Sequence, residues 1–235
     1  MQEEKSFEQR FNELAAFFNA AAHELRTPVT TGKIYLQLVQ EMMKDSDDKA
    51  VTDNLQKTEA QFNKLNLLIS NILDVSRMHT GKFDVSVEAI DLNEAVNTAV
   101  SAKNSALQRF NLERRGNATT QVQGNKERIV QIILNLLDNA VKYSKAGSSI
   151  TVAIEENETH VALTVSDEGK GISAEMLQTI FEQRTITAGK AAAGLGISLF
   201  VSKAIADKMG ATLSVQSEPN KGSAFTLLLK KITQS

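Results

Sequence analysis

Hydrophobic residues recur at steps of four and three along the first 43 residues, with one missed step at Gly32. This heptad spacing predicts a long helix with an apolar seam. The seam consists of Phe7, Phe11, Leu14, Phe18, Ala21, Leu25, Val29, Leu36, Val39 and Met43. A charged stretch at 43–49 predicts a turn, and a second seam then runs to about Gly81, where glycine can end a helix. The second seam consists of Leu55, Phe62, Leu65, Ile69 and Ile72.

The two predicted helices carry more apolar stripe than one partner can cover, which favours the pairing of two copies as a four-helix bundle. His23 and Glu24 lie off the seam and are expected to face solvent. Pro28 lies inside the first helix, where it removes one backbone hydrogen bond, frees the carbonyl of Glu24 and bends the helix. Two interpretations fit this bend: it lets the histidine segment reorganise, or it is a tolerated kink. A purely structural coiled-coil dimer with an incidental histidine also fits the seam.

After Lys82 the pattern changes to shorter helices and alternating strands. Helices are predicted at about 91–107, 125–143 and 194–209. Strands are predicted at 149–154, 160–165, 212–217 and 223–229. The expected fold class is therefore α+β: a helical hairpin over residues 1–81, followed over 82–235 by an α/β sandwich with helices on one face of a mostly antiparallel sheet.

The amino-acid composition excludes some classes of protein without selecting a single class. The 235 residues are 42% hydrophobic and 23% charged, enough for two domains with a sizeable core. A net charge of only −2 gives no nucleic-acid footprint, and the absence of cysteine excludes a disulfide framework or a thiolate metal site. The apolar runs are short, and none approaches the roughly 18 residues that span a bilayer.

The first candidate for chemistry is the string from Ala22 to Pro28. A neutral imidazole such as that of His23 is nucleophilic near neutral pH, and the carboxylate of Glu24 can fix its tautomer and take the displaced proton. Thr27 follows one helical turn later. Taken alone, such a pair is more often a solvated helix surface.

The second candidate is the string from Asn135 to Ser144. Asn135 and Asn139 are four residues apart and so share one face of the predicted helix. Asparagine carbonyls are hard oxygen ligands that suit Mg²⁺ beside phosphate oxygens, and Lys142 adds a cation for the phosphates. The spacing alone fits an ordinary helix surface as well.

Two glycine-containing strings complete the candidate set. In the stretch from Asp167 to Ile172, Gly169 and Gly171 follow an apolar strand and allow close backbone approach to a ligand, while Asp167 could accept a hydrogen bond from an adenine amino group. An ordinary turn is the alternative. The stretch 193–196 opens a helix whose free amides and positive dipole end can hold phosphate.

Together, in this order, these strings resemble the catalytic core of the histidine protein kinases of two-component signalling over nearly the whole chain. The resemblance implies a dimeric phosphoacceptor hairpin followed by a Bergerat-type ATP-binding domain. It implies that His23 accepts the γ-phosphoryl group and that Glu24 orients or deprotonates the His23 side chain. It also implies that Thr27 positions the water that dephosphorylates a partner response regulator.

The resemblance assigns roles in the ATP-binding domain as well. Asn139 would bind Mg²⁺, Asn135 would support the metal site, Lys142 and Tyr143 would contact nucleotide, and Asp167 would read adenine. The remaining nucleotide-contacting positions that it implies are Gly169, Gly171, Ile172, Gly194, Leu195 and Gly196.

The resemblance implies ATP and Mg²⁺ as cofactors. It implies a response-regulator receiver domain and a second copy of the chain as partners, with no nucleic acid. No membrane span is expected in this chain. The location that the resemblance implies is the cytoplasmic portion of an inner-membrane sensor.

The chain departs from the family pattern in the segment expected to cover the phosphates. Arg184 stands where the family has the second phenylalanine of a Phe-x-x-Phe box, Ala192 replaces a glycine, and the segment is short. An alternative function is therefore a nucleotide-sensing scaffold or phosphatase-biased regulator with weak kinase activity. A chaperone- or repair-type ATPase is disfavoured, because that class has a water-activating glutamate where this chain has Asn135.

Overall fold

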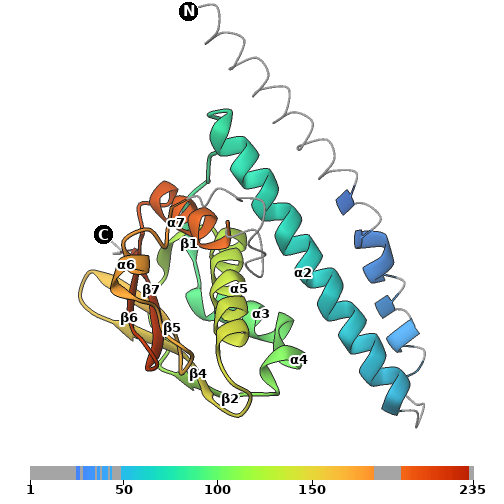
Figure 1. The fold of residues 1–235 in the computed structure, drawn as a ribbon. Helices are drawn as coiled ribbons and strands as arrows, with labels where there is room; N and C mark the ends of the chain where they lie inside the picture. Colours follow the sequence, from blue (N-terminus) through green and yellow to red (C-terminus); the bar gives the residue numbers. More distant parts are fainter. Residues whose placement is uncertain are drawn as a thin grey trace, which may run out of the picture. The chain divides into compact units, whose positions relative to one another are not determined.

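The computed structural model describes residues 25–26, 29–34, 36–37, 39–41, 43, 49–182 and 197–232. The chain divides into two compact units, Met1–Phe83 and Asp84–Ser235 (Figure 1). The first unit is helical where it is described, and the second combines helices with sheets. The predicted α+β class is therefore confirmed.

In the first unit, every described residue from 25 to 41 is helical, and helix α2 spans Lys49–His79. Val29 is buried together with Ile69 and Leu73 of α2, and Phe62 packs against this cluster. The other seam positions that the structure describes are less buried. Seam positions that remain exposed in the single chain are Leu25, Val39 and Leu65.

The second unit is built on a five-stranded sheet with the strand order β2-β4-β5-β7-β6. Its strands are β2 (Asn111–Arg115), β4 (Ser149–Glu156), β5 (His160–Asp167), β6 (Thr212–Glu218) and β7 (Gly222–Lys230). β2 pairs with β4 in parallel and the other three pairs are antiparallel, which confirms the predicted mostly antiparallel sheet. A separate two-stranded sheet pairs β1 (Glu88–Ile90) with β3 (Val122–Gly124).

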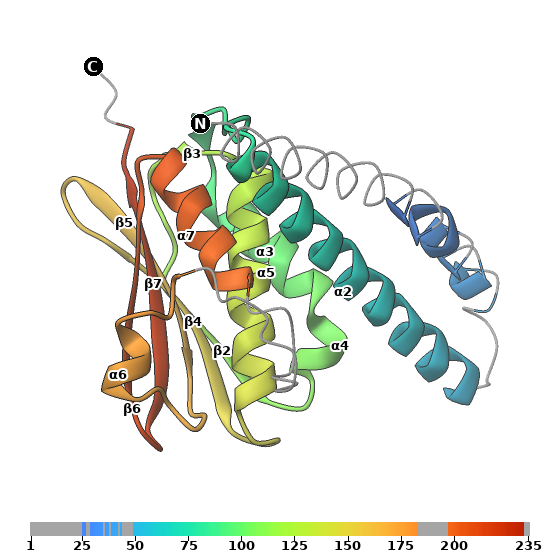
Figure 2. The same ribbon diagram turned by 45° about the horizontal axis from the view of Figure 1, so that its top comes forward.

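Three helices cover one face of the large sheet, as predicted (Figure 2). They are α3 (Leu92–Ala102), α5 (Lys126–Tyr143) and α7 (Ser198–Lys208). Two further helices in the described part of this unit are short: α4 (Asn104–Leu107) and α6 (Ala174–Leu177). Alternate side chains of β4 and β5 point into the core, because successive residues of a strand face opposite sides of a sheet. Most residues on the apolar face of α5 meet them with almost no exposed surface.

Local side-chain bonds set where the helices begin. The side chain of Asp91 accepts a hydrogen bond from the Asn93 amide at 2.8 Å at the start of α3. The side chain of Asn125 accepts one from the Arg128 amide at 3.1 Å at the start of α5. Each cap satisfies a helix amide that has no partner within its own helix. The first of these helices ends at Ala102, with Lys103 as its C-cap, earlier than the predicted limit of 107, and a separate short helix, α4, follows.

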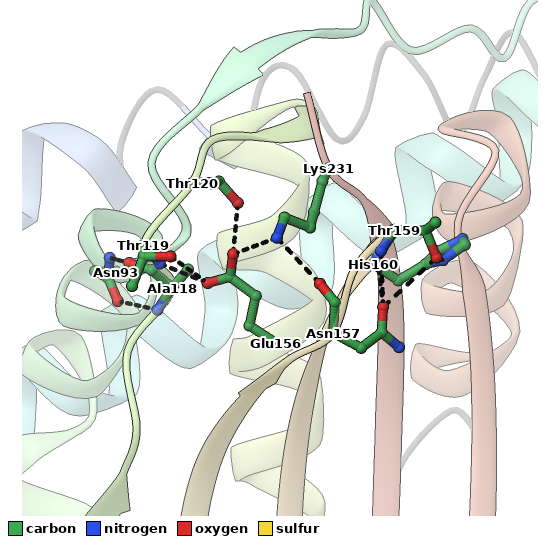
Figure 3. Close-up of polar contacts among 9 residues, drawn as sticks. All are labelled: Asn93, Ala118, Thr119, Thr120, Glu156, Asn157, Thr159, His160 and Lys231. Carbon is green, nitrogen blue, oxygen red and sulfur yellow. Dashed lines mark hydrogen bonds and ion pairs between the residues drawn. The ribbon is translucent and has the colours of Figure 1, made fainter. Parts of the chain in front are cut away.

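A cluster of polar contacts around the Glu156 carboxylate connects the loop before β3 to the sheet (Figure 3). Glu156 accepts hydrogen bonds from the Thr119 amide at 2.7 Å, the Thr119 hydroxyl at 2.8 Å and the Thr120 hydroxyl at 2.9 Å. It also pairs with the Lys231 ammonium at 2.6 Å. Next to it, Asn93 and Ala118 exchange two hydrogen bonds of 2.9 and 3.0 Å. The donors from Lys231, Thr119 and Thr120 stabilise the ionised carboxylate of Glu156. They lower its pKa from 4.5 to about 2, with Lys231 the largest cause.

We expect this cluster to give the second unit a defined acid sensitivity. Because the folded pKa of Glu156 is depressed, its contribution to stability is present above pH 4.5 and is lost as the pH falls toward about 2. Glu156→Gln should therefore reduce the free energy of unfolding near neutral pH, and its difference from wild type should vanish near pH 2. Urea unfolding across this range measures the effect. Glu113→Gln, which removes an exposed ion pair with Arg115, is the matched control. An equal, pH-independent loss in both variants would contradict the prediction.

Candidate functional site

The two asparagines on α5 lie in different environments. Asn135 is only 1% exposed, and its Nδ2 donates to the Ser202 hydroxyl at 3.0 Å and to the Ser198 carbonyl at 3.3 Å. Its amide therefore joins α5 to α7. The Nδ2 of Asn139, one turn later, is buried and has no hydrogen-bond partner among the described residues.

An unpartnered buried amide is costly unless a ligand satisfies it. The carbonyl oxygen of the Asn139 amide is a hard donor suited to Mg²⁺, and its NH₂ group can donate to a phosphate oxygen. Within the described residues, no group of three or more His, Asp or Glu side chains converges as a metal cage. The donor set therefore fits a cation shared with phosphate oxygens and water.

At the end of α5, two lysine ammonium groups lie near the Tyr143 ring. The Lys142 and Lys170 ammonium groups each lie 4.7 Å from the centroid of the Tyr143 ring, which is 42% exposed. Both cations are close enough for attraction to the negative face of the ring. Lys142 and Tyr143 were candidates from the sequence, whereas Lys170 was not. This ring and its two cations suit the flat base and the phosphates of a nucleotide.

Asp167 closes β5 and lies opposite Ser223 of β7 in the sheet register. Its Oδ1 accepts a hydrogen bond from the Gly169 amide at 2.8 Å and a longer one, at 3.5 Å, from the Ser144 hydroxyl. The pKa of Asp167 is raised, because partial burial disfavours the charge more than these bonds favour it. A half-buried acceptor held by neighbouring backbone is a suitable reader of an amino group on a planar ring.

The glycines after Asp167 make close backbone contacts, but with the protein itself. A Cβ on Gly169 would lie 2.6 Å from the Tyr143 carbonyl oxygen, and one on Gly171 would lie 1.9 Å from the Glu218 carbonyl oxygen. Gly171 also has a φ of +66°. The next amide, that of Ile172, donates to the Ser217 hydroxyl at 2.9 Å. These glycines thus hold the loop against α5 and the β6–β7 turn, next to Asp167.

We expect Gly171→Ala to be strongly destabilising. Alanine in the left-handed region costs roughly 1–2 kcal/mol, and the contact with Glu218 backbone adds a shift of the β6–β7 turn. Gly210→Ala is the matched control, because Gly210 has a φ of +68° but open space around its Cβ position. Urea unfolding should give a larger loss of unfolding free energy for Gly171→Ala. Equal losses would show that backbone strain alone fixes this position.

Among the described residues, polar contacts between side chains cross between the helical segments of the first unit at three places. Arg26 donates to the Ser70 hydroxyl at 3.1 Å. Lys33 donates to the Asn63 side chain at 2.7 Å, and the contact between Gln37 and Glu59 is longer, at 3.4 Å. These contacts join the two helical segments at the end of the histidine string and just after it.

Several sequence-predicted residues lie outside the described residues. They are His23, Glu24, Thr27, Gly194, Leu195 and Gly196, together with the departures at Arg184 and Ala192. The described candidates from α5 and the Asp167 loop do come together: the Tyr143 carbonyl accepts the Lys170 amide at 3.4 Å. The sequence prediction included Ser144 in the second string without giving it a role, and it missed Ser202 and Ser217, because isolated serines carry no spacing signal.

Comparison with known proteins agrees with both units. The family model described as "His Kinase A (phospho-acceptor) domain" matches residues 13–81. The model described as "Histidine kinase-, DNA gyrase B-, and HSP90-like ATPase" matches residues 124–233.

Individual relatives extend the likeness across the whole chain. The sensor histidine kinase YcbM of Bacillus subtilis is 30% identical over 90% of this chain and 70% of its own length. The alginate biosynthesis sensor protein KinB of Pseudomonas aeruginosa is 29% identical over 97% of this chain, which spans only 38% of KinB. The solved structure of the Acinetobacter baumannii histidine kinase AdeS has a similar fold, with a TM-score of 0.58 and 24% identity over 90% of this chain and 98% of that one.

Each helix in the described part of the chain falls short of the length or apolar character that crossing a bilayer requires. The paired phosphoacceptor and ATPase matches, and a 30% identical relative covered over most of its length, establish that this chain belongs to the sensor histidine kinases.

Proposed function

We propose that this chain transfers the γ-phosphoryl group of ATP to His23 and then passes it to an aspartate of a response-regulator receiver domain. The observation that carries the proposal is the presence in one chain of a phosphoacceptor match that contains His23 and a nucleotide-type site around Asn139 and Asp167. Positioning and charge neutralisation supply most of the catalysis in phosphoryl transfer.

In this proposal Asp167 accepts a hydrogen bond from the adenine amino group, and Tyr143 and Lys142 contact the nucleotide. The Asn139 amide meets the phosphates, and Asn135 holds α5 against α7 so that the amide stays in place. Mg²⁺, when bound by the Asn139 oxygen, would neutralise charge on the phosphate oxygens. Gly169, Gly171 and Ile172 shape the adenine side of the pocket, and Gly194, Leu195 and Gly196 supply phosphate-binding amides.

In the first unit, the proposal gives His23 the role of nucleophile. Its neutral imidazole attacks the γ-phosphorus, ADP leaves, and Glu24 orients the ring and takes the proton that the ring loses. We propose that residues 1–81 are the dimerisation and phosphoacceptor hairpin and that 82–235 are the ATP-binding domain. Exposed seam side chains, such as Leu25 at 55% and Leu65 at 40%, support burial against a second copy as a four-helix bundle.

A water-activating ATPase remains the poorer alternative. In place of a glutamate base, the chain has the neutral amide of Asn135, which is engaged with Ser202. An amide cannot accept a proton from water at neutral pH, so the geometry disfavours hydrolysis.

Phosphotransfer tests the partner proposal directly. The chain is labelled with radioactive ATP, freed of nucleotide and mixed with purified receiver domains. Label should leave the chain and appear rapidly on the cognate receiver domain. A receiver whose acceptor aspartate is replaced by alanine is the control. Label that stays on the kinase with every receiver would contradict the transfer step.

The greater length of KinB supports our proposal that this core belongs to a larger inner-membrane sensor and lies on its cytoplasmic side. Fractionation of cells carrying a tagged chromosomal copy tests this placement. Recovery of the full-length tagged protein in the soluble fraction would contradict it.

Thr27 is expected to serve the reverse reaction on the phosphorylated regulator. Thr27 follows His23 by four residues, one turn of the predicted helix, and its hydroxyl can align water against the phosphoaspartate, a task that autophosphorylation does not need. Thr27→Ala should slow regulator dephosphorylation and largely spare labelling of His23. The matched control is Thr31→Ala, one turn further along the helix and exposed. Equal loss of both activities in Thr27→Ala would instead assign Thr27 to helix structure.

A further inference from the structure

Two ion pairs join α3 and its C-terminal junction to α5, one near each end of the interface. Near the start of α5, Lys126 and Glu94 pair at 2.5 Å, with 39% and 62% of their side chains exposed. Twelve residues further along α5, Asp138 pairs with Lys103, whose side chain is only 10% exposed. The second pair lies directly beside Asn139 in the sequence, and the proposed function does not use it.

The backbone around Lys103 is held firmly. Lys103 ends α3, and its amide donates to the Val100 carbonyl at 3.1 Å. Its own carbonyl accepts the amides of Ala106 and Leu107, both at 3.0 Å, which begins α4. Leu107 is itself only 2% exposed. The ammonium group of Lys103 therefore extends from a fixed point between two helices.

Stability alone is a weak explanation for this pair. Removing the Lys103 ammonium from water is costly, while the Asp138 side chain is 36% exposed, so solvent screens the attraction that would offset this cost. The buried side chains of α3 and α5 are mostly apolar; they include Val96, Ala99, Ile133 and Leu136. A directional contact in such surroundings fixes one arrangement of the helices in a way that apolar packing does not.

The pair acts on the same turn of α5 as the candidate metal site. Asn135, three residues before Asp138, is held from the α7 side by Ser202. Asp138 is held from the α3 side by Lys103. The turn from 135 to 139 is thus restrained from two sides, and the buried Nδ2 of Asn139 on this turn lacks a partner within the described residues.

We propose that Lys103 and Asp138 form a positioning pair that sets the orientation of α5 so that the Asn139 amide meets the Mg²⁺-bound phosphates of ATP. This inference rests on the proposed role of Asn139. Neither residue touches nucleotide in this scheme. Their effect is transmitted through the helix, as outer-shell contacts orient the ligands of other metal sites.

The test is the double variant Lys103→Met/Asp138→Leu, which replaces the ion pair by apolar side chains of similar length and so avoids an unpaired buried charge. Calorimetry measures the affinity for ATP with Mg²⁺ and for adenosine, and urea unfolding measures stability. The affinity for Mg²⁺-ATP should fall roughly 10- to 100-fold, as for other outer-shell changes, with the adenosine affinity and stability largely retained. A purely structural pair would leave the ratio of the two affinities unchanged.

Lys126→Met/Glu94→Leu is the matched control, since it removes the exposed ion pair at the other end of the same helix interface; both affinities should stay at wild-type values. Lys103→Gln, whose amide can still donate to Asp138 without a charge, covers the case in which the double variant does not fold, and it should show a smaller loss in the same direction. An unchanged ratio of Mg²⁺-ATP to adenosine affinity in a folded variant of the pair overturns the inference.

Asn139→Ala separates this inference from the proposed function. If Asn139→Ala loses the preference for Mg²⁺-ATP and the folded pair variants keep it, the pair has no positioning role and the assignment of Asn139 stands. If Asn139→Ala itself binds Mg²⁺-ATP as wild type does, the assignment of Asn139 fails and the inference fails with it.

Discussion

Replacing His23 with glutamine is expected to abolish stable phosphorylation of the chain while leaving nucleotide binding nearly intact. Glutamine is polar and a good helix former, so the helix is retained, but its amide is not a nucleophile toward phosphorus. The measurement is incorporation of label from radioactive ATP with Mg²⁺, together with calorimetric ATP affinity. The loss of labelling in His23→Gln should be complete, because the variant lacks the nucleophile that accepts the phosphoryl group.

His79→Gln is the matched control for His23→Gln. His79 is an exposed histidine in the same unit, at the end of α2, with its Nδ1 2.9 Å from the Val75 carbonyl oxygen. Its replacement should leave labelling at the wild-type level. Wild-type labelling of His23→Gln, or loss of labelling in His79→Gln, would assign the acceptor elsewhere.

Replacing Asp167 with asparagine is expected to weaken adenosine and ATP binding strongly without unfolding the protein. A hydrogen bond to a charged group contributes about 1.5–3 kcal/mol, so the loss in affinity should be roughly 10- to 100-fold. Because burial raises the pKa of Asp167, the ionised form is disfavoured in the fold. Removing the charge should therefore cause little loss of stability.

Calorimetry with adenosine isolates the adenine contact, since adenosine carries no phosphate. Glu168→Gln is the neighbouring control, because Glu168 is exposed and its carboxylate accepts the Ser149 amide at 2.8 Å, a bond that glutamine can also accept. Adenosine affinity that is unchanged in Asp167→Asn would remove Asp167 from adenine recognition.

Much of the fold could be predicted from periodicity. The strands β4, β5, β6 and β7 alternate cleanly, and α5 has a continuous apolar face, so each was predicted close to its observed bounds. Three strands were missed. β1 and β3 have three residues each, and β2, with the sequence Asn-Leu-Glu-Arg-Arg, has one apolar side chain. Their pairing depends on distant partners, such as β4 for β2, and not on a local pattern.

The candidate site divides in the same way. Asn139 and Asp167 lie in strings with recognisable order, so the sequence pointed to them and to a nucleotide. The contacts that hold them come from far along the chain: Ser202 is 67 residues from Asn135, and Lys103 is 35 residues from Asp138. The glycines illustrate the limit most clearly, since their close contacts proved to be with the backbone of Tyr143 and Glu218. Folding in three dimensions creates these contacts, and no spacing encodes them.

The chemical nature of the phosphorylated product tests the central claim most directly. Wild-type chain is incubated with radioactive ATP and Mg²⁺, and the labelled protein is divided between acid and alkali before peptide mapping. We expect a phosphoryl linkage that acid destroys and alkali preserves, carried by the peptide that contains His23. Acid-stable label would contradict it, as would rapid release of phosphate from ATP with no labelled protein at any time point.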